Sequence, residues 1–249
     1  MPLRTVSTLI TSLRTRSWRE LAPFGILALI AAMLAAFGKI ADEVVGGQTH
    51  AFDETILRAL RNPLDLADPI GPAWLELVMQ DITSLGSFTV VSAVTLITVG
   101  YLLIDRKRAT AAFVLVAICG GVVLSEALKH LFARPRPELV AHLVEVHTAS
   151  FPSGHAMLSA VTYLTLGALL ARIQSRNRLK AYVIAVAILL TLLIGGSRVY
   201  LGVHWPTDVL AGWCAGAAWA MGCWLLAVWL QSRGEIEQSD GNGGPGTVG

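Results

Sequence analysis

The sequence predicts an all-α integral membrane protein, a bundle of six transmembrane helices with a short amphipathic helix in its first extracytoplasmic loop. Of its 249 residues 54% are hydrophobic and only 14% are charged, a composition that suits a surface solvated by lipid. Six apolar stretches approach or reach about 20 residues, the length that spans a hydrocarbon core about 30 Å thick. Because lipid offers the backbone no hydrogen-bond partners, we expect each stretch to be helical.

The six predicted spans are separated by polar segments. They cover residues 21–40, 85–104, 110–132, 153–173, 181–197 and 206–230. The first span follows a basic segment, so a cleaved signal peptide is an alternative to a permanent helix. The leading polar region is long, the apolar stretch exceeds the usual length, and no clean small-x-small site follows, which favours the permanent helix.

We expect a single membrane domain with a polar segment at each end. Residues 1–20 form a basic cytoplasmic tail, residues 21–231 form the six-span domain, and residues 232–249 form a polar, Gly-rich tail that is predicted to be disordered. The net charge is only +2, and no basic stripe is interleaved with aromatic residues, which argues against a nucleic-acid partner. The three cysteines lie in apolar stretches and fit neither a disulfide framework nor a zinc site.

Lysine and arginine predict which side of the membrane each loop faces. They gather in the N-terminal tail, after the second span and after the fourth span, which share one side in a six-span protein. The basic residues concerned are Arg4, Arg14, Arg16, Arg19, Arg106, Lys107, Arg108, Arg172, Arg176, Arg178 and Lys180. The positive-inside rule places that side, and with it both termini, in the cytoplasm. The opposite side receives a long acidic loop, residues 41–84.

This first extracytoplasmic loop contains a short amphipathic stretch. Over residues 51–60, the side chains of Phe52, Ile56, Leu57 and Leu60 fall on one stripe of a helix. Such a helix would either pack within the loop or lie on the membrane surface beside the functional site.

Three polar clusters stand at span ends on the side opposite the basic loops, and the first of them ends the third span. It contains Lys129 and, between two prolines, Arg136. The prolines hold the neighbouring backbone extended, so that an ammonium and a guanidinium can meet at one point, a pairing that suits phosphate. A lysine that snorkels at a helix end is the alternative for Lys129 alone. Arg134 would touch either a second phosphate or the lipid surface.

The second cluster opens the fourth span with Ser153, Gly154 and His155. Ser153 stands where an N-cap residue would stand, and helix N-termini present free N–H groups and a favourable dipole to anions. The Ser153 side chain and the N–H groups of Gly154 and His155 would therefore cradle a phosphoryl oxygen. Taken alone, the cluster also fits an ordinary capped helix with a histidine at the membrane interface.

The third cluster joins the last two spans and contains Arg198, His204 and Asp208. His204 and Asp208 lie one helical turn apart, so the carboxylate can reach the imidazole. A carboxylate on one ring nitrogen fixes the tautomer and leaves the other nitrogen free to attack. Taken alone, the cluster also fits a helix whose N-terminal acid is stabilised by the helix dipole.

Other polar residues stand near the clusters. Glu126 precedes Lys129 by one helical turn and is expected to form an ion pair with it. His142 and His147 share the next loop with acidic residues, where they would be solvated or would bind a metal ion or a headgroup.

Together the three clusters resemble the type 2 phosphatidic acid phosphatase (PAP2) family, whose pattern is K-x6-RP, then PSGH, then SR-x5-H-x3-D. The matching positions are Lys129, Arg136, Pro137, Pro152, Ser153, Gly154, His155, Ser197, Arg198, His204 and Asp208. The motifs cover residues 120–210, and the six-span layout extends the resemblance to residues 20–230. Each motif is weak alone, whereas the three in this order are highly specific.

The resemblance implies a catalytic set that works without a metal ion or any other cofactor. His204 would attack phosphorus and form a phosphohistidine, with Asp208 orienting it, while His155 would protonate the departing oxygen and then activate water. The residues implied to hold the phosphoryl oxygens are Lys129, Arg136, Ser153, Gly154 and Arg198. Because His204 must be unprotonated and His155 charged, a bell-shaped pH dependence is expected.

The function that the resemblance predicts is hydrolysis of the phosphate or diphosphate headgroup of a membrane lipid on the extracytoplasmic face of the bacterial inner membrane. Substrates that the family suggests are polyprenyl diphosphate, phosphatidylglycerophosphate, phosphatidic acid and lipid A 1-phosphate. The expected partner is this lipid within the bilayer, and no obligate protein partner is inferred. A lipid phosphotransferase on the same scaffold fits the motifs equally well. A lipid-binding transporter is a third alternative, against which the gathering of polar groups at one surface argues.

Overall fold

The computed structural model describes the backbone of residues 3–144 and 148–232 and the side chains of residues 23–144 and 148–231. Its elements are α1 (Leu3–Val45), α2 (His50–Ala59), β1 (Arg61–Asn62), β2 (Asp65–Pro69), α3 (Ala73–Ser84), α4 (Phe88–Ile104), α5 (Arg108–Phe132), α6 (Gly154–Ile173), α7 (Asn177–Tyr200) and α8 (Pro206–Ser232). In these ranges five helices are long and apolar enough to cross a membrane, and the number reaches six if α3 and α4 count as one bent span. Of the predicted polar tail, residues 232–249, the structure describes only Ser232, the last residue of α8, and the rest lies outside the described residues.

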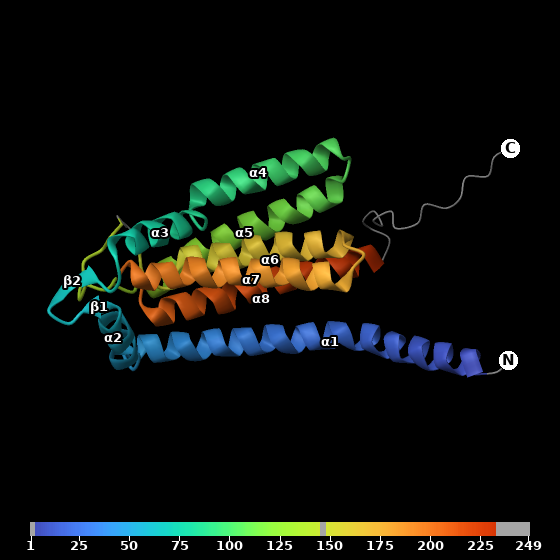
Figure 1. Ribbon diagram of the computed structural model, residues 1–249, viewed down its shortest axis with the longest axis horizontal. Helices are drawn as coiled ribbons and strands as arrows, with labels where there is room; N and C mark the ends of the chain where they lie inside the picture. Colours follow the sequence, from blue (N-terminus) through green and yellow to red (C-terminus); the bar gives the residue numbers. More distant parts are fainter. Residues whose placement is uncertain (1–2, 145–147, 233–249) are drawn as a thin grey trace.

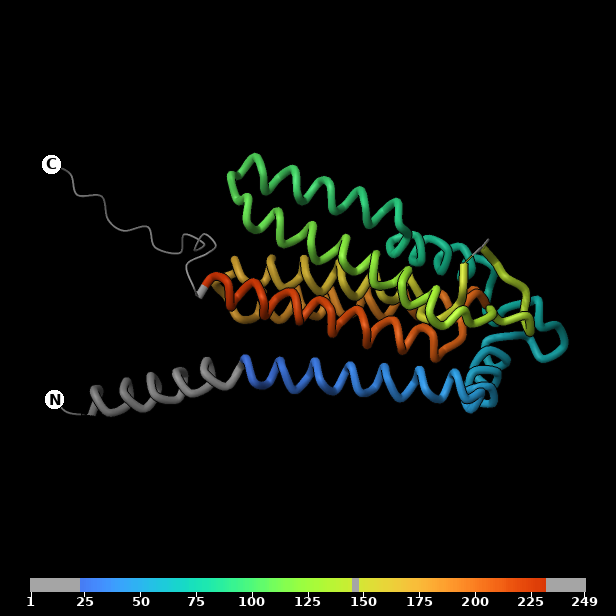
Figure 2. Tube along the Cα trace, turned by 180° about the vertical axis from the view of Figure 1, so that it is seen from behind, coloured from blue at the N-terminus to red at the C-terminus, as the bar shows by residue number. Residues whose placement is uncertain are grey.

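The helices form an elongated bundle whose two ends differ. Figure 1 shows α6, α7 and α8 in the middle, α4 and α5 along one side, and α1 along the other. The first loop, with α2, α3 and the β1–β2 hairpin, gathers at one end, and the α4–α5 and α6–α7 turns lie at the other. The view from behind shows the same division (Figure 2). The first loop therefore covers the end at which α5 and α7 finish and α6 and α8 begin.

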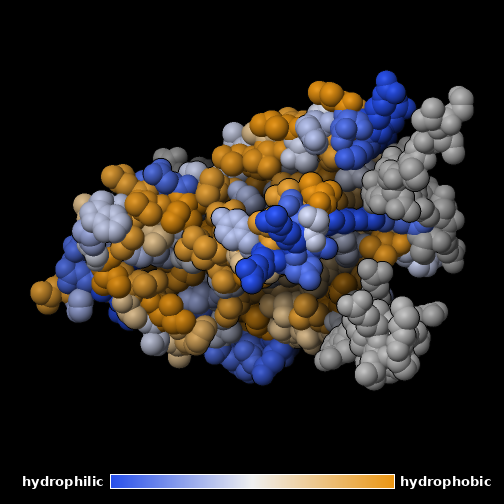
Figure 3. Space-filling model, turned by 45° about the vertical axis from the view of Figure 1, so that its right-hand side comes forward, coloured by the Kyte–Doolittle hydropathy of each residue, from blue (hydrophilic) through white to orange (hydrophobic). Residues whose placement is uncertain are grey.

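The central helix is α6, and the peripheral helices turn apolar side chains outward. Of the most apolar stretch of α6, 56% is buried inside the protein, against 6% of the corresponding stretch of α1. On α4, Leu96, Ile97 and Ile104 are 68%, 73% and 85% exposed. Hydrophobic side chains cover much of the face seen in the space-filling view (Figure 3). Exposed apolar surface of this extent is stable in lipid and costly in water.

The second predicted span, residues 85–104, corresponds to α4, and a helix that the sequence did not predict precedes it. That helix is α3, which is joined to α4 through a break with a bend of 46°. Ser87 begins α4 because its hydroxyl accepts a hydrogen bond from the N–H of Val90 at 3.2 Å. At Gly86, in the break, a Cβ atom would overlap Ile194 of α7 and lie 3.3 Å from the carbonyl oxygen of His155. The break therefore packs directly against α7 and the start of α6.

The transmembrane part is all-helical, as the sequence predicts, and the first loop adds a small antiparallel sheet that it does not predict. The strands β1 and β2 form a hairpin. The Asn62 side chain closes the turn, since it accepts the N–H of Leu64 at 3.1 Å and donates to Asp68 of β2 at 3.0 Å. Strand β1 has two residues and β2 has five, Asp65–Pro69, without a run of alternating apolar residues, which explains why the pattern did not reveal the hairpin.

The helix α2 occupies the amphipathic stretch of the first loop. Leu57 is fully buried, in a cluster that includes Val199 and Val209. Phe52 is 50% exposed. α2 therefore packs on the end of α7 and the beginning of α8, and its contact with a membrane surface stays a prediction.

Two glycines one turn apart let α8 approach α6 closely. A Cβ atom at Gly212 would lie 2.7 Å from the carbonyl oxygen of Ser153, and one at Gly216 would lie 2.5 Å from that of Met157. Small residues at this spacing are the usual means by which membrane helices bring their backbones together. In this protein the close approach places the start of α6 beside the start of α8.

We expect Gly216→Ala to lower the unfolding temperature of the detergent-purified protein, because the added methyl group meets backbone that cannot turn aside. An overpacked site of this kind costs about 1–3 kcal/mol. The control is Gly222→Ala in the same helix, where a Cβ atom would find nothing within 4 Å. Equal unfolding temperatures for the two variants would contradict the close α6–α8 contact.

Candidate active site

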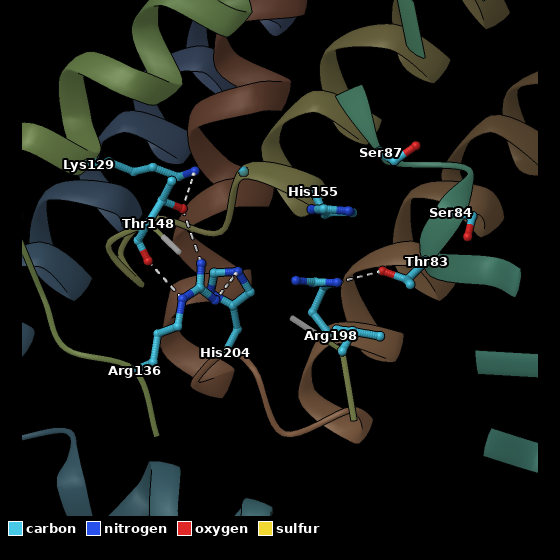
Figure 4. Close-up of a pocket in the computed structure, with 11 residues that line it drawn as sticks. Thr83, Ser84, Ser87, Lys129, Arg136, Thr148, His155, Arg198 and His204 are labelled. Carbon is cyan, nitrogen blue, oxygen red and sulfur yellow. Dashed lines mark hydrogen bonds between the residues drawn. The ribbon is translucent and has the colours of Figure 1, made fainter. Parts of the chain in front are cut away.

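A cavity of about 300 Å³ opens at the end of the bundle that the first loop covers. Figure 4 shows its polar side chains, which come from five parts of the chain and converge on one space. Its lining residues are Thr83, Ser84, Ser87, Lys129, Arg136, Val144, Thr148, Gly154, His155, Arg198 and His204. The structure thus brings together most of the site residues that the sequence predicts, and it places Ser153 and Asp208 immediately behind them.

Lys129 and Arg136 reach the cavity because α5 ends abruptly between them. Ala133 adopts a left-handed conformation at φ 45°, and its N–H closes the helix on the carbonyl oxygen of Lys129 at 2.9 Å. Arg136 then donates to the carbonyl oxygens of Val203 at 2.6 Å and Thr148 at 2.8 Å. The Thr148 hydroxyl accepts from both cations, at 3.2 Å from the Lys129 ammonium and at 3.2 Å from Arg136. One neutral oxygen therefore holds two positive groups side by side.

The start of α6 presents backbone, and not a serine cap, to this space. Ser153 occupies the N-cap position, but its hydroxyl makes no cap hydrogen bond and is buried without a partner among the described residues. Its N–H donates to the Asp208 carbonyl oxygen at 3.0 Å. A Cβ atom at Gly154 would lie 3.1 Å from the Lys129 ammonium, so the glycine leaves room beside that charge. The first N–H groups of a helix have no acceptor within it and face an anion favourably.

His204 lies between a cation and a carboxylate and is 2% exposed. Its Nε2 is 3.2 Å from an Arg136 nitrogen, and its Nδ1 is 3.4 Å from Asp208. Because arginine can only donate, Nε2 must carry the lone pair and Nδ1 the proton. Burial lowers the pKa of His204 well below its ordinary value, and the nearby charges of Arg198, Arg136 and Lys129 lower it further. The imidazole is therefore held neutral, with its basic nitrogen toward the cavity.

Asp208 is fully buried and has a partner on each oxygen. Its Oδ2 accepts from the Ser150 hydroxyl in a short hydrogen bond and from the Trp205 N–H at 2.9 Å. Its Oδ1 accepts from Arg134 at 2.6 Å. The sequence placed Arg134 against a second phosphate or the lipid surface, and both alternatives are wrong, because its side chain is 8% exposed and paired with carboxylates inside the protein.

Arg198 supplies the third cation of the cavity from the last turn of α7. It is 4% exposed, and it donates to the Thr83 hydroxyl at 3.1 Å. Its Nε is buried without a partner among the described residues. A buried guanidinium with an unused donor is costly unless an anion completes it. Thr83 lies at the end of α3, so the break before α4 forms the wall opposite Lys129.

Three other polar residues lie beside the cavity or apart from it. Glu126 pairs with Lys129 at 3.2 Å, which the one-turn spacing predicted. His142 contacts the carbonyl oxygen of Pro137 at 2.6 Å and does not line the cavity. His147 lies outside the described residues. Among the residues whose positions are described, no group of three or more His, Cys, Asp or Glu side chains is arranged to hold a metal ion.

Several residues of the site escaped the sequence reasoning. Ser150 and Thr148 precede the second motif without matching it, and the contacts of Thr83 depend on the α3–α4 break. The sequence holds one sign of the role of Asp53, because this residue falls within the apolar stripe of its predicted helix. In the structure Asp53 is fully buried. A carboxylate on the apolar face of a helix indicates a buried partner. That partner is Arg134, at 2.8 Å.

Comparison with known proteins identifies the family. A sequence model of the PAP2 superfamily matches residues 110–232. Phosphatidylglycerophosphatase B of Bacillus subtilis (strain 168) is 36% identical over 146 residues, which are 57% of this chain and 70% of that protein. The chain belongs to the PAP2 superfamily. As a member of it, the chain is an integral membrane enzyme, a lipid phosphatase.

Two further matches extend the likeness to PAP2 proteins. The undecaprenyl-diphosphatase of Sulfolobus acidocaldarius is 31% identical over 144 residues, 55% of this chain and 63% of that protein, which is less than two thirds of its length. A crystal structure of a transmembrane PAP2-type phosphatidylglycerolphosphate phosphatase from Bacillus subtilis aligns with a TM-score of 0.72. That alignment has 29% sequence identity and covers 82% of this chain and 96% of the other. The PAP2 likeness therefore includes the arrangement of the membrane helices.

We expect Thr148→Val to weaken the binding of inorganic phosphate to this PAP2 protein, because valine no longer holds Lys129 and Arg136 together. Loss of one such acceptor costs about 1 kcal/mol, or about fivefold in affinity. Calorimetric titration of the purified protein with phosphate measures it. The control is Thr191→Val in α7, where the hydroxyl donates to the carbonyl oxygen of Ala187 at 2.9 Å. Equal affinities in the two variants would contradict the role of Thr148.

Proposed function

We propose that this PAP2 member hydrolyses the phosphate or diphosphate headgroup of a membrane lipid through a phosphohistidine on His204. One observation supports this more than any other. The Nε2 atom of His204 faces the cavity, 3.2 Å from Arg136, while Nδ1 faces the Asp208 carboxylate. A buried, neutral imidazole with its lone pair directed at an anion site is the arrangement that a nitrogen nucleophile requires.

In the first step of the proposed reaction, Nε2 of His204 attacks phosphorus and the bond to the leaving oxygen breaks. The leaving oxygen takes a proton from His155, which lines the same cavity. The Nδ1 proton stays on His204, and the carboxylate of Asp208 stabilises the positive charge that develops on the ring. In the structure Arg136 occupies the lone pair of Nε2, so the phosphate must first draw the guanidinium away.

In the second step a water molecule attacks the phosphohistidine and the P–N bond breaks. His155 accepts a proton from this water and is ready for another cycle, and His204 regains its lone pair. The net reaction converts a lipid phosphate and water into the lipid alcohol and inorganic phosphate, or a lipid diphosphate and water into the lipid monophosphate and inorganic phosphate. If a lipid alcohol replaced water, the same steps would make the protein a phosphotransferase.

The cations supply the electrostatic part of the proposed mechanism. Phosphoryl transfer depends mainly on positioning and on neutralising the charge of the equatorial oxygens. Lys129, Arg136 and Arg198 converge on the cavity with the backbone at the start of α6 (Figure 4). They present positive charge from several directions, which is the role that metal ions play in other phosphatases. We therefore propose that the reaction needs no metal ion.

We place the site on the extracytoplasmic face of the bacterial inner membrane, with both termini cytoplasmic. The cavity lies at the end with the acidic first loop, and the basic α4–α5 and α6–α7 turns lie at the other end (Figure 1). The positive-inside rule supports that orientation. A cavity at the span ends would admit a headgroup while the acyl or prenyl chains stay in the bilayer. The names of the relatives support phosphatidylglycerophosphate and undecaprenyl diphosphate as the first substrates to test.

Phosphate release from a panel of lipid phosphates by the detergent-purified protein, with EDTA present, tests this proposal. The panel contains phosphatidylglycerophosphate, undecaprenyl diphosphate, phosphatidic acid and lipid A 1-phosphate. We expect His204→Gln to lower the rate at least about a thousandfold, the scale of loss when a nucleophile is removed. The control is His130→Gln, at an exposed histidine of α5, which should leave the rate unchanged.

Three outcomes of this assay would contradict parts of the proposal. Full activity in His204→Gln would exclude that residue as the nucleophile. Activity lost with EDTA and restored by a divalent ion would exclude the metal-independent mechanism. Phosphate transferred to an added lipid alcohol, with little free phosphate, would identify a phosphotransferase.

A further inference from the structure

A buried ion network behind the cavity joins the first loop to the residues that carry the proposed chemistry. Asp53 of α2 and Asp208 of α8 are fully buried, and Arg134 lies between them at 8% exposure. Burying three charges is costly unless each is paired and hydrogen-bonded. The network lies outside the PAP2 motif pattern except for Asp208.

Arg134 uses both ends of its guanidinium in this network. One nitrogen donates to Asp208 at 2.6 Å and to the Thr207 hydroxyl at 2.9 Å. The other donates to Asp53 at 2.8 Å and to the Thr49 hydroxyl at 3.1 Å. The planar fork of arginine fixes the relative direction of the groups it binds, which a lysine cannot do.

Asp53 also holds the first turn of α8. Its Oδ1 accepts the N–H of Thr207 at 3.0 Å, and its Oδ2 accepts the hydroxyl of Thr207 at 2.7 Å. A carboxylate on the first N–H groups of a helix caps it and is favoured by the helix dipole. α8 is thus capped by a residue more than 150 positions earlier, and Asp208 is the next residue after the capped one.

These contacts determine which oxygen of Asp208 faces the imidazole. Arg134 holds Oδ1, so Oδ2 is left for Ser150, the Trp205 N–H and Nδ1 of His204. Rotation of the carboxylate would break the bond to Arg134. We propose that Asp53 and Arg134 are positioning residues that hold Asp208 in register with His204, which makes helix α2 a working part of the active site.

This inference rests on the proposed role of His204 and adds a charge effect that can be measured. The charged or titratable groups around His204 are Lys129 of α5, Arg136 of the loop, His155 of α6, Arg198 of α7 and Asp208 of α8, with Arg134 and Asp53 behind Asp208. His204 attacks only when unprotonated, so kcat/KM falls as the pH drops through its pKa. A cation removed from this set raises that pKa, and an anion removed lowers it.

The test compares Asp53→Asn, Arg134→Gln and Arg134→Lys in the detergent-purified full chain. We expect kcat to fall about 10- to 100-fold in the first two, by analogy with the loss of an outer hydrogen-bond partner of a metal-bound histidine. KM should stay within about twofold, because neither residue lines the cavity. The acid limb of kcat/KM should move to lower pH in Asp53→Asn and to higher pH in Arg134→Gln. Arg134→Lys keeps the charge and should leave the limb in place.

The matched control is the exposed pair on the same helix, Glu54 and Arg58, whose charged groups are 3.7 Å apart. Glu54→Gln and Arg58→Gln make the same charge changes on α2 and should alter neither kcat nor the acid limb. Two results together would show that the network is only structural and would overturn the inference. They are an unchanged acid limb of kcat/KM in Asp53→Asn and Arg134→Gln, and a fall in kcat no larger than the fall in the folded fraction. Unchanged kcat in Asp53→Asn would also overturn it. Both results are separate from the His204→Gln result, which alone tests the nucleophile.

Discussion

The rest of the site depends on one interaction, the pairing of the buried Arg134 guanidinium with the carboxylates of both Asp53 and Asp208. It joins the chain after α5 to the first loop and to the start of α8. Asp53 also accepts the N–H of Thr207 and so caps the start of α8. This places Asp208, in the first turn of α8, beside the imidazole of His204. Charges this deeply buried tolerate little displacement, because each would lose its partner. The buried ion pairs therefore hold Asp208 in a fixed position behind the cavity, while the cavity itself stays open to an anion.

The helix pattern and the chemistry of the motifs were readable in the sequence because both depend on local constraints. A span needs a minimum apolar length, and basic residues mark loop sides, so the helix bundle and the common end of the three clusters follow from spacing alone. The spacing of His204 and Asp208 predicted that the carboxylate faces the imidazole, and the two groups lie 3.4 Å apart. Lys129 and Arg136 converge because α5 ends between them, as the Pro-Arg-Pro segment predicted.

The parts that the sequence did not predict are the contacts between distant segments. Nothing within α2 says that Asp53 meets Arg134, 81 residues later, since only the folded bundle brings them together. The helix α3 was missed because polar residues such as Glu76 and Asp81 interrupt its apolar pattern, and the break at Gly86 that separates it from α4 packs against α7. The Ser153 hydroxyl was expected to hold a phosphoryl oxygen, which stays a prediction, and in the structure that oxygen is buried without a partner among the described residues. Contacts of this kind depend on tertiary packing, which local sequence preference does not encode.

The most direct measurement is to identify the phosphorylated residue during turnover. The variant His155→Ala lacks the group that activates water, and an activated aryl phosphate needs no proton on its leaving group, so the phosphoryl-enzyme should accumulate. The reaction is stopped in alkaline detergent, in which phosphohistidine survives, and the peptides are mapped by mass spectrometry. The proposed mechanism predicts a phosphoryl group on His204 and none in the His155→Ala/His204→Gln double variant. Steady phosphate release without label on His204, or label on another residue, would contradict it.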